Sequence, residues 1–179
     1  MLDAIAHSNG TQRGVAMVKP DVAEKELERL HVGGVRGARI NFVAHLGGAP
    51  DMKAVEAVIA RITPFGWHIQ LHMDAHEIPL YRSFLDELKN PLAWTKISGA
   101  DRITATGKPF HDAEPFVREL ITAAPSQLLW GTDFPHPNAT YMPNDGELVD
   151  LFAKFCDDEA KRRKILVDNA TKLYRPELL

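Results

Sequence analysis

The sequence predicts an α/β fold in which helices cover a parallel sheet. Short β-type runs alternate with helical segments along nearly the whole chain, and this order is typical of parallel sheets. The composition agrees, because 179 residues with 45% hydrophobic and 25% charged side chains can bury a sizeable core. We therefore expect one globular domain over residues 1–179.

Five runs are too short or too rich in β-branched residues to be convincing helices. They are rich in valine, isoleucine and aromatic residues, and turn-forming residues separate them from their neighbours. The predicted strands cover residues 13–18, 35–42, 67–73, 94–98 and 127–131.

Helical spacing of apolar residues fills the gaps between these runs. The first helix follows Asp21 and Glu24, which have the spacing of a capping box, and ends at Gly33-Gly34. The second begins near Asp51 and ends before Pro64. Later apolar stripes predict helices around residues 80–88, 112–124, 148–155 and 157–174, with a polar loop at 99–109.

The charge balance argues against several classes of partner. Lys and Arg number 21 against 24 Asp and Glu, so no overall positive field attracts nucleic acid or an anionic membrane. The single cysteine, Cys156, cannot form an internal disulfide, and the first residues do not resemble a signal peptide. We expect a cytoplasmic protein that binds neither nucleic acid nor membrane.

Side-chain alternation along the predicted strands points to a site. His68, Gln70 and His72 share one face of their strand, opposite an apolar face. Arg39 and Asn41 likewise share a face near the end of theirs. Lys96 and Ser98 fall together in the fourth strand, and Asp133 follows the fifth strand in phase with Leu129 and Gly131. In parallel α/β folds the carboxyl ends of the strands build the site, so these polar residues are candidates for it.

These residue types suit hydrolysis of a small acidic molecule. A carboxylate at Asp133 can activate water or hold a metal ion, and Arg39 can bind a substrate carboxylate with two parallel hydrogen bonds. Structural roles are open for each residue. Asp133 can cap a turn, the alternating histidines can be hydrogen-bonded wall residues, and Arg39 can form a structural ion pair. His136, between Pro135 and Pro137, can be an exposed rigid turn.

Two other features have structural interpretations. The run Lys161-Arg162-Arg163-Lys164 is typical of a solvated helix face, and Cys156 lies on an apolar helix face with no local sign of an activated thiolate. The sequence contains no phosphate-cradling glycine loop, no paired-cysteine metal motif and no Gly-x-Ser-x-Gly elbow.

Several segments, taken in order, resemble the amidohydrolase-related family, on the branch of 2-pyrone-4,6-dicarboxylate lactonase-like hydrolases. The resemblance covers nearly the whole chain, and its most specific segment is 130–138. The segments are 13–16 (RGVA), 34–42 (GVRGARINF), 96–102 (KISGADR), 130–138 (WGTDFPHPN) and 165–174 (ILVDNATKLY).

The resemblance implies a (β/α)8 barrel of the TIM type in which Asp133 acts on the hydrolytic water. It implies that Arg39 and Arg102 bind substrate carboxylates and that His72 lines the site. Asn41, Ser98 and His136 complete the set of expected substrate-binding residues. The lactonase branch requires no metal or other cofactor, whereas other members of the family use a zinc ion for hydrolysis or decarboxylation.

The sequence also departs from the family pattern. The His-x-His pair of the first family strand is absent, and only Pro91-Leu92-Ala93 stands where the family has a further helix and strand with a site histidine. We therefore expect a partial barrel of about five parallel strands that lacks the N-terminal strands and one middle strand–helix unit. The alternative to an active lactone hydrolase is a truncated, non-catalytic chain that associates with itself; a zinc-dependent hydrolase or decarboxylase is a further alternative.

Overall fold

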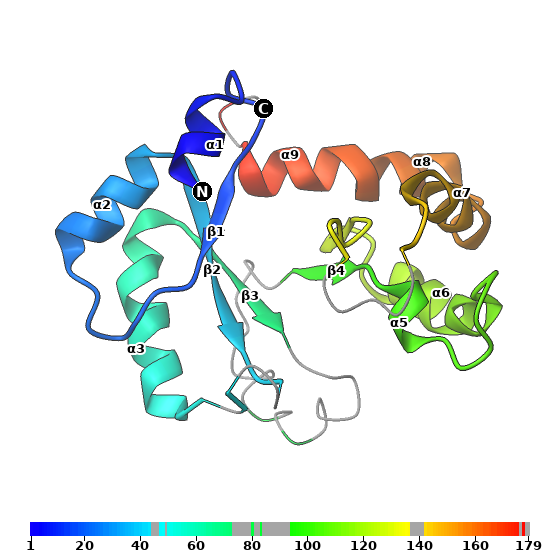
Figure 1. Cartoon of the computed structure of the whole chain (residues 1–179), viewed down its shortest axis with the longest axis horizontal. Helices are drawn as coiled ribbons and strands as arrows, with labels where there is room; N and C mark the ends of the chain where they lie inside the picture. Colours follow the sequence, from blue (N-terminus) through cyan, green and yellow to red (C-terminus); the bar gives the residue numbers. More distant parts are fainter. Residues whose placement is uncertain are drawn as a thin grey trace. The chain divides into compact units, whose positions relative to one another are not determined.

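The computed structural model describes residues 1–43, 47–48, 50–72, 80, 83, 94–136, 142–175 and 177, with the backbone alone at 102 and 103. Its parallel strands and flanking helices confirm the predicted α/β class (Figure 1). The chain forms two compact units, Met1–Trp94 and Thr95–Leu179, which we call the first and second unit.

The first unit is built on a three-stranded parallel sheet. Strands β1 (Gly14–Ala16), β2 (Val35–Asn41) and β3 (His68–His72) pair in the order β1-β2-β3. The short helix α1 (Leu2–Ala6) precedes β1, and helices α2 (Glu24–Val32) and α3 (Met52–Ile62) connect the strands. Figure 1 shows α2 and α3, in blue and cyan, along the same side of the sheet. A 3-10 turn (Thr63–Phe65) links α3 to β3.

The core of this unit lies between the sheet and the two connecting helices. Leu27 and Leu30 of α2 are buried at helical spacing, as the sequence predicts. Trp67 anchors the base of β3, since its side chain is almost fully buried and its Nε1 donates to His31 Nδ1 at 3.0 Å. The buried cluster contains Ala16, Leu27, Leu30, Val35, Ala38, Ile40, Phe42, Val55, Val58, Ile62, Trp67 and Ile69.

Of the two helix starts predicted in this unit, the one at Asp51 is correct and the one at Asp21 is wrong. Asp51 caps α3 by accepting a hydrogen bond from the backbone N of Lys53 at 3.1 Å. The capping box of Asp21 and Glu24 is wrong, because α2 begins at Glu24 itself after Ala23, which has extended dihedrals and no side-chain cap. Glu24 therefore acts within the first turn, where its charge favours the helix dipole. The predicted helix around 80–88 lies outside the described residues, except for single positions.

The second unit contains a two-stranded parallel sheet and most of the helices described. Strands β4 (Thr95–Ile97) and β5 (Leu128–Trp130) pair with each other. The helices are α5 (Ala100–Ile103), α6 (Glu114–Ala123), α7 (Asp145–Phe155), α8 (Glu159–Arg163) and α9 (Asn169–Tyr174). A 3-10 turn (His111–Ala113) leads into α6, and a π-helical stretch (Lys164–Asp168) joins α8 to α9.

The segment after β4 differs from the predicted polar loop, and the helix predicted from residue 112 begins at Glu114. The stretch 99–109 is not purely a loop, since it contains α5. Asp112 does not cap α6; its carboxylate instead accepts hydrogen bonds from the Thr104 hydroxyl and the Ala105 N–H, both at 2.6 Å. These bonds lower the pKa of Asp112 to about 2. Phe116, an apolar residue of the helix predicted at 112–124, is half exposed, so it does not belong to the buried stripe.

The C-terminal helices pack onto β5 through apolar and polar contacts. Leu148, Leu151, Phe152 and Phe155 of α7 are buried as predicted. Asn169, at the start of α9, is also buried, and its amide donates to the backbone O of Leu128 at 2.7 Å and of Pro125 at 2.9 Å. This side chain thus supplies a hydrogen-bond donor to backbone carbonyls just before and at the start of β5.

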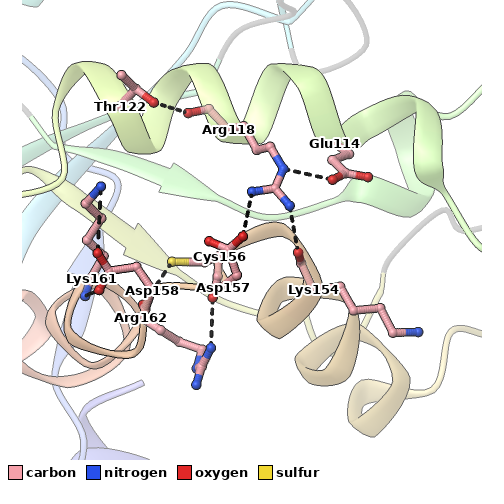
Figure 2. A network of polar contacts seen from close by, with 9 residues as sticks. All are labelled: Glu114, Arg118, Thr122, Lys154, Cys156, Asp157, Asp158, Lys161 and Arg162. Atoms are coloured by element: carbon pink, nitrogen blue, oxygen red, sulfur yellow. Dashed lines mark hydrogen bonds and ion pairs between the residues drawn. The ribbon is translucent and has the colours of Figure 1, made fainter.

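A polar network joins α6, the end of α7 and α8 (Figure 2). Arg118 of α6 donates to Glu114 at 2.8 Å and to the backbone O of Lys154 at 3.0 Å. Arg162 of α8 donates to the backbone O of Cys156 at 2.8 Å. Burial raises the pKa of the Cys156 thiol, so the cysteine is a packing residue, as expected, and Arg162 has a structural role within the basic run.

Among the helices of the described segments, none combines the length and the apolar character needed to cross a bilayer.

Candidate functional site

The alternation predicted for the first unit is confirmed by the register of its strands. Three polar or glycine positions of β2 lie directly beside three polar positions of β3, in the pairs Gly37–His68, Arg39–Gln70 and Asn41–His72. Side chains at alternate positions share a face, so these pairs form one polar stripe that runs toward the carboxyl ends of both strands.

The first pair of this stripe has a structural role. His68 is only 3% exposed, and a Cβ at Gly37 would lie 2.5 Å from its Cε1. Gly37 therefore provides the space in which the imidazole packs. Burial lowers the pKa of His68, so its ring is neutral near pH 7. For this histidine, the interpretation as a wall residue is correct.

The last pair of the stripe forms a hydrogen-bonded cluster with Arg39. The side-chain oxygen of Asn41 accepts from Arg39 Nε at 3.2 Å and from His72 Nδ1 at 3.2 Å. The amide of Asn41 in turn donates to Met17 Sδ, beyond β1, at 3.6 Å. Three residues that the sequence nominated thus lie together, and Asn41 orients both the guanidinium and the imidazole. Within the described part of the chain no carboxylate pairs with Arg39, so the structural ion pair considered for it is not found there.

In the second unit the strand register leads to a lysine–aspartate pair. Lys96 of β4 lies beside Leu129 of β5, and Gly131 continues β5 without a side chain. Lys96 Nζ reaches Asp133 Oδ1 at 3.9 Å. Both side chains keep about a third of their surface exposed, at 38% and 31%, so the pair is open to a small molecule. Lys96 shares its strand face with Ser98, as predicted, but the family resemblance assigns it no role.

The turn after β5 holds Asp133 in an uncommon conformation. Asp133 and His136 both have positive φ angles, 70° and 57°, and the N–H of His136 donates to the backbone O of Asp133 at 2.8 Å. Such angles cost about 1 kcal/mol or more for residues other than glycine, and clusters of them often mark functional sites. The turn is closed by backbone groups, while the Asp133 carboxylate faces Lys96.

His136 is not the exposed turn residue that its flanking prolines suggested. It is 3% exposed, and its Nε2 donates to Asp145 Oδ1 at 3.1 Å. Asp145 is the first residue of α7. The sequence analysis of strand faces gives no hint of this partner, which lies nine residues further along the chain.

Ser98 and Arg102 follow β4. Ser98 is half-buried and comes directly before Gly99, whose φ of 74° turns the chain into α5. The backbone of Arg102 belongs to α5, while its side chain lies outside the described atoms. The structure thus places Ser98, Arg102, Asp133 and His136 after strands of the second unit, and Arg39, Asn41 and His72 at strand ends of the first.

Two hollows, of about 490 and 290 Å³, lie elsewhere in the units. The larger is lined by residues around α1 and the start of β2, and the smaller by residues of α7 with Lys108 and Phe110. None of the nominated residues lines either hollow, so the strand ends, not these hollows, define the candidate site.

A zinc centre would need several ligands close together. Within the described residues no three His, Cys, Asp or Glu side chains are grouped in a way that could hold a metal ion. This part of the chain does not fit a resident zinc, which normally takes at least three protein ligands.

The sequence profile of the Amidohydrolase family matches residues 1–92 and 82–175. The chain belongs to the amidohydrolase family. It is accordingly a hydrolase by class, and its α/β architecture with parallel strands is that of a partial TIM-type barrel. The two matched stretches meet at residues 82–92, next to the position where a strand–helix unit is expected to be missing.

Individual relatives agree with this assignment. The chain is 32% identical to a 2-pyrone-4,6-dicarboxylate hydrolase of Comamonas testosteroni, over 99% of this chain and 71% of the relative. It is 29% identical to a 4-sulfomuconolactone hydrolase of Hydrogenophaga intermedia, over 97% of this chain and 68% of the relative. A solved structure of a candidate 2-pyrone-4,6-dicarboxylic acid hydrolase from Pseudomonas putida matches with a TM-score of 0.79 and 26% identity, over 97% of this chain and 75% of that one.

The relatives contain more residues than this chain within the matched span. The Comamonas alignment covers 219 residues but takes in 99% of a 179-residue chain, so about 40 residues of the relative have no counterpart here. The chain spans about 70% of the length of the two relatives.

Proposed function

We propose that this chain hydrolyses a small carboxylated lactone of the 2-pyrone-4,6-dicarboxylate type, with Asp133 as the base that activates water. The observation that carries the proposal is the pairing of Asp133 with Lys96 just beyond β5, where both side chains remain partly exposed. The relatives support the substrate class, since two of them are hydrolases named for lactone-type substrates.

The chemistry requires only a carboxylate and a water molecule. Asp133 accepts a proton from water, and the water oxygen attacks the lactone carbonyl carbon. The ring C–O bond then breaks, and the released oxygen takes up the proton from Asp133. The new carboxylic acid loses the second proton of the water to solvent and becomes a carboxylate. A single carboxylate can serve both proton transfers because it gives back the proton that it received.

Lys96 suits the charge that this reaction develops. Attack on the carbonyl places negative charge on its oxygen, and the opened ring ends in a new carboxylate. A cation that is already positioned stabilises such charge without reorganisation. The Lys96 ammonium, 3.9 Å from the Asp133 carboxylate, is therefore suited to stabilise the negative charge on the carbonyl oxygen.

The substrate carboxylates are assigned to the arginines. Arg39 is half-buried and its Nε is held by Asn41, which leaves the two terminal nitrogens of the guanidinium to form a bidentate contact. The family resemblance gives Arg102 the same role. We assign Asn41, His72, Ser98 and His136 to the substrate-binding set, with no metal or other cofactor required.

A second candidate function is a non-catalytic chain that associates with itself. It is favoured by the roughly 40 residues of the relatives that have no counterpart within the matched span. A parallel sheet that lacks a strand presents unpaired backbone groups at its edge, and such edges pair with other chains.

Turnover of 2-pyrone-4,6-dicarboxylate, followed by loss of the pyrone absorbance, tests the proposal. We expect Asp133→Asn to lower kcat/KM by at least about 100-fold, the usual contribution of a general base. Asp150→Asn, which removes one exposed carboxylate of α7, should stay within about twofold of the unmodified chain.

Three results would contradict the proposal. If Asp133→Asn retains turnover, Asp133 is not the base. Loss of turnover with a chelator would favour the zinc-dependent alternative. A folded chain without turnover that sediments as a dimer or larger assembly would favour the second candidate.

A further inference from the structure

His136 differs from the other nominated residues because its side chain is buried. Its ring is 1% exposed although it lies between two prolines in the segment after β5. A ring this deeply covered has little surface to offer a substrate. The contacts of the ring and of its backbone therefore indicate a different role from the substrate binding assigned above.

The backbone of His136 is bonded directly to the residue proposed as the base. Its N–H donates to the backbone O of Asp133 at 2.8 Å, and both residues have positive φ angles. A turn with two such angles is kept only when its surroundings determine it. The conformation of Asp133 thus depends on where His136 is held.

Asp145 is the polar group that holds the ring of His136. Its Oδ1 accepts from Nε2 at 3.1 Å, and Asp145 belongs to α7, an eleven-residue helix whose apolar face is buried in the core. The other ring nitrogen, Nδ1, is buried and has no hydrogen-bond partner in the described part of the chain. Of the described groups, the Asp145 carboxylate therefore supplies the polar anchor of the ring, with Phe134 packed edge-on at 6.4 Å between ring centroids.

We propose that His136 and Asp145 are positioning residues that fix the turn carrying Asp133. The chain of contacts runs from the helix α7 through the Asp145 carboxylate to the His136 ring, and from the His136 N–H to the backbone of Asp133. This inference rests on the proposed function of Asp133 as the base, and it replaces substrate binding by His136 with control of the position of that base.

Asp145→Ser tests the pair, because serine is well accepted at a helix start but is too short to reach the ring. We expect the His136 amide, which is the only N–H between Pro135 and Pro137, to exchange with solvent at least tenfold faster by NMR. We expect kcat to fall about tenfold while KM stays within twofold, since the turn would spend less time in the productive geometry. If Asp145→Ser does not fold, Asp145→Ala gives the same measurement.

Two further variants separate positioning from a general effect on stability. Asp145→Asn retains an acceptor for Nε2 and should restore the exchange rate and kcat to within threefold of the unmodified chain. Glu147 is an acid of the same helical turn and pairs with Lys108. Glu147→Ser should leave the exchange rate of the His136 amide unchanged.

Unchanged exchange of the His136 amide in Asp145→Ser would overturn the proposal, as would an equal increase in Glu147→Ser. The exchange measurement does not depend on turnover. If Asp133→Asn shows that Asp133 is not the base, the exchange rates still establish whether Asp145 holds the turn, so the two failures can be told apart.

Discussion

The two units of the chain hold their polar residues by different means. In the first unit Arg39, Asn41 and His72 lie on paired strands, and their contacts follow from the strand register. In the second unit Asp133 and His136 lie in a turn after a strand, and their contacts reach Lys96 and the helix α7. Strand register repeats every two residues and can be predicted from the sequence, whereas the conformation of a turn depends on the residues packed around it.

Under the proposed function, Arg39 of the first unit binds a substrate carboxylate and Asp133 of the second unit acts as the base, so we call the two units the binding half and the catalytic half. The first unit offers a guanidinium oriented by an amide, which suits recognition of a carboxylate. The second offers a carboxylate beside an ammonium, which suits proton transfer and charge stabilisation. Substitutions in the first unit should therefore change KM, and those around Asp133 should change kcat.

Replacement of Arg39 by lysine is the strongest test of the binding half. Lysine keeps the charge but loses the planar fork and the Nε contact with Asn41. We expect KM for the dicarboxylate to rise roughly 10- to 100-fold, the range for losing charge-assisted hydrogen bonds, with kcat nearly unchanged. Arg36 is the control, because its guanidinium donates to the backbone carbonyls of His31 and Val35. Arg36→Lys should leave KM unchanged. A lower kcat at constant KM in Arg39→Lys would break the division between the units.

Glycine replacement compares the packing of the two units. In Gly37→Ala the new Cβ would lie 2.5 Å from the buried ring of His68, whereas in Gly131→Ala it would meet Lys96 Cδ at an ordinary 3.7 Å. We expect Gly37→Ala to lower the free energy of unfolding by about 1–3 kcal/mol and Gly131→Ala by less than about 0.5 kcal/mol, measured by urea denaturation. The Gly37→Ala penalty should shrink in a His68→Ala background. Equal effects at both glycines would mean that the His68 ring can move aside.

Acid should weaken the two units in different pH windows, and this is the smallest effect we expect. Burial lowers the pKa of His68, and burial with the nearby Arg36 charge lowers that of His31. Below pH 6.5 the unfolded chain therefore binds protons that the folded chain does not, and stability falls as pH falls. Asp112, with a pKa of about 2 against 3.8, adds stability that is lost as pH falls from about 4 toward 2.

Urea midpoints between pH 7.5 and 2 check this difference. His68→Gln should flatten the upper window in part, because His31 still contributes, and Asp112→Asn should flatten the lower one. A histidine variant that changed only the lower window would contradict the assignment.

The strands and their faces could be predicted because they depend on local pattern. The five strands of the described residues all fall within the predicted ranges, and the alternation of residues 67–73 predicted which side chains share a face with Arg39 and Asn41. Helices α3 and α7 were also predicted, since a stripe of apolar residues at helical spacing needs a core to cover it. Helix ends were less predictable. Asp21 and Asp112 both have the chemistry of a cap, but Asp112 is used to close the loop at 104–106.

The sequence by itself determined the α/β class, the strand positions, the polar stripe of the first unit and the nomination of Asp133. These follow from periodicity and from the segments that resemble the amidohydrolase family. Only the tertiary structure decided that Lys96 faces Asp133, that His136 is buried against Asp145 and that Asn169 donates to the backbone O of Leu128 at the start of β5. Those partners lie 9 to 41 residues apart along the chain or across a strand pair. Folding alone brings such groups together. His136 and Asn169 are buried, and a buried polar group takes a hydrogen-bond partner from whatever part of the packed chain lies beside it, whereas the register of β4 and β5 brings Lys96 near Asp133.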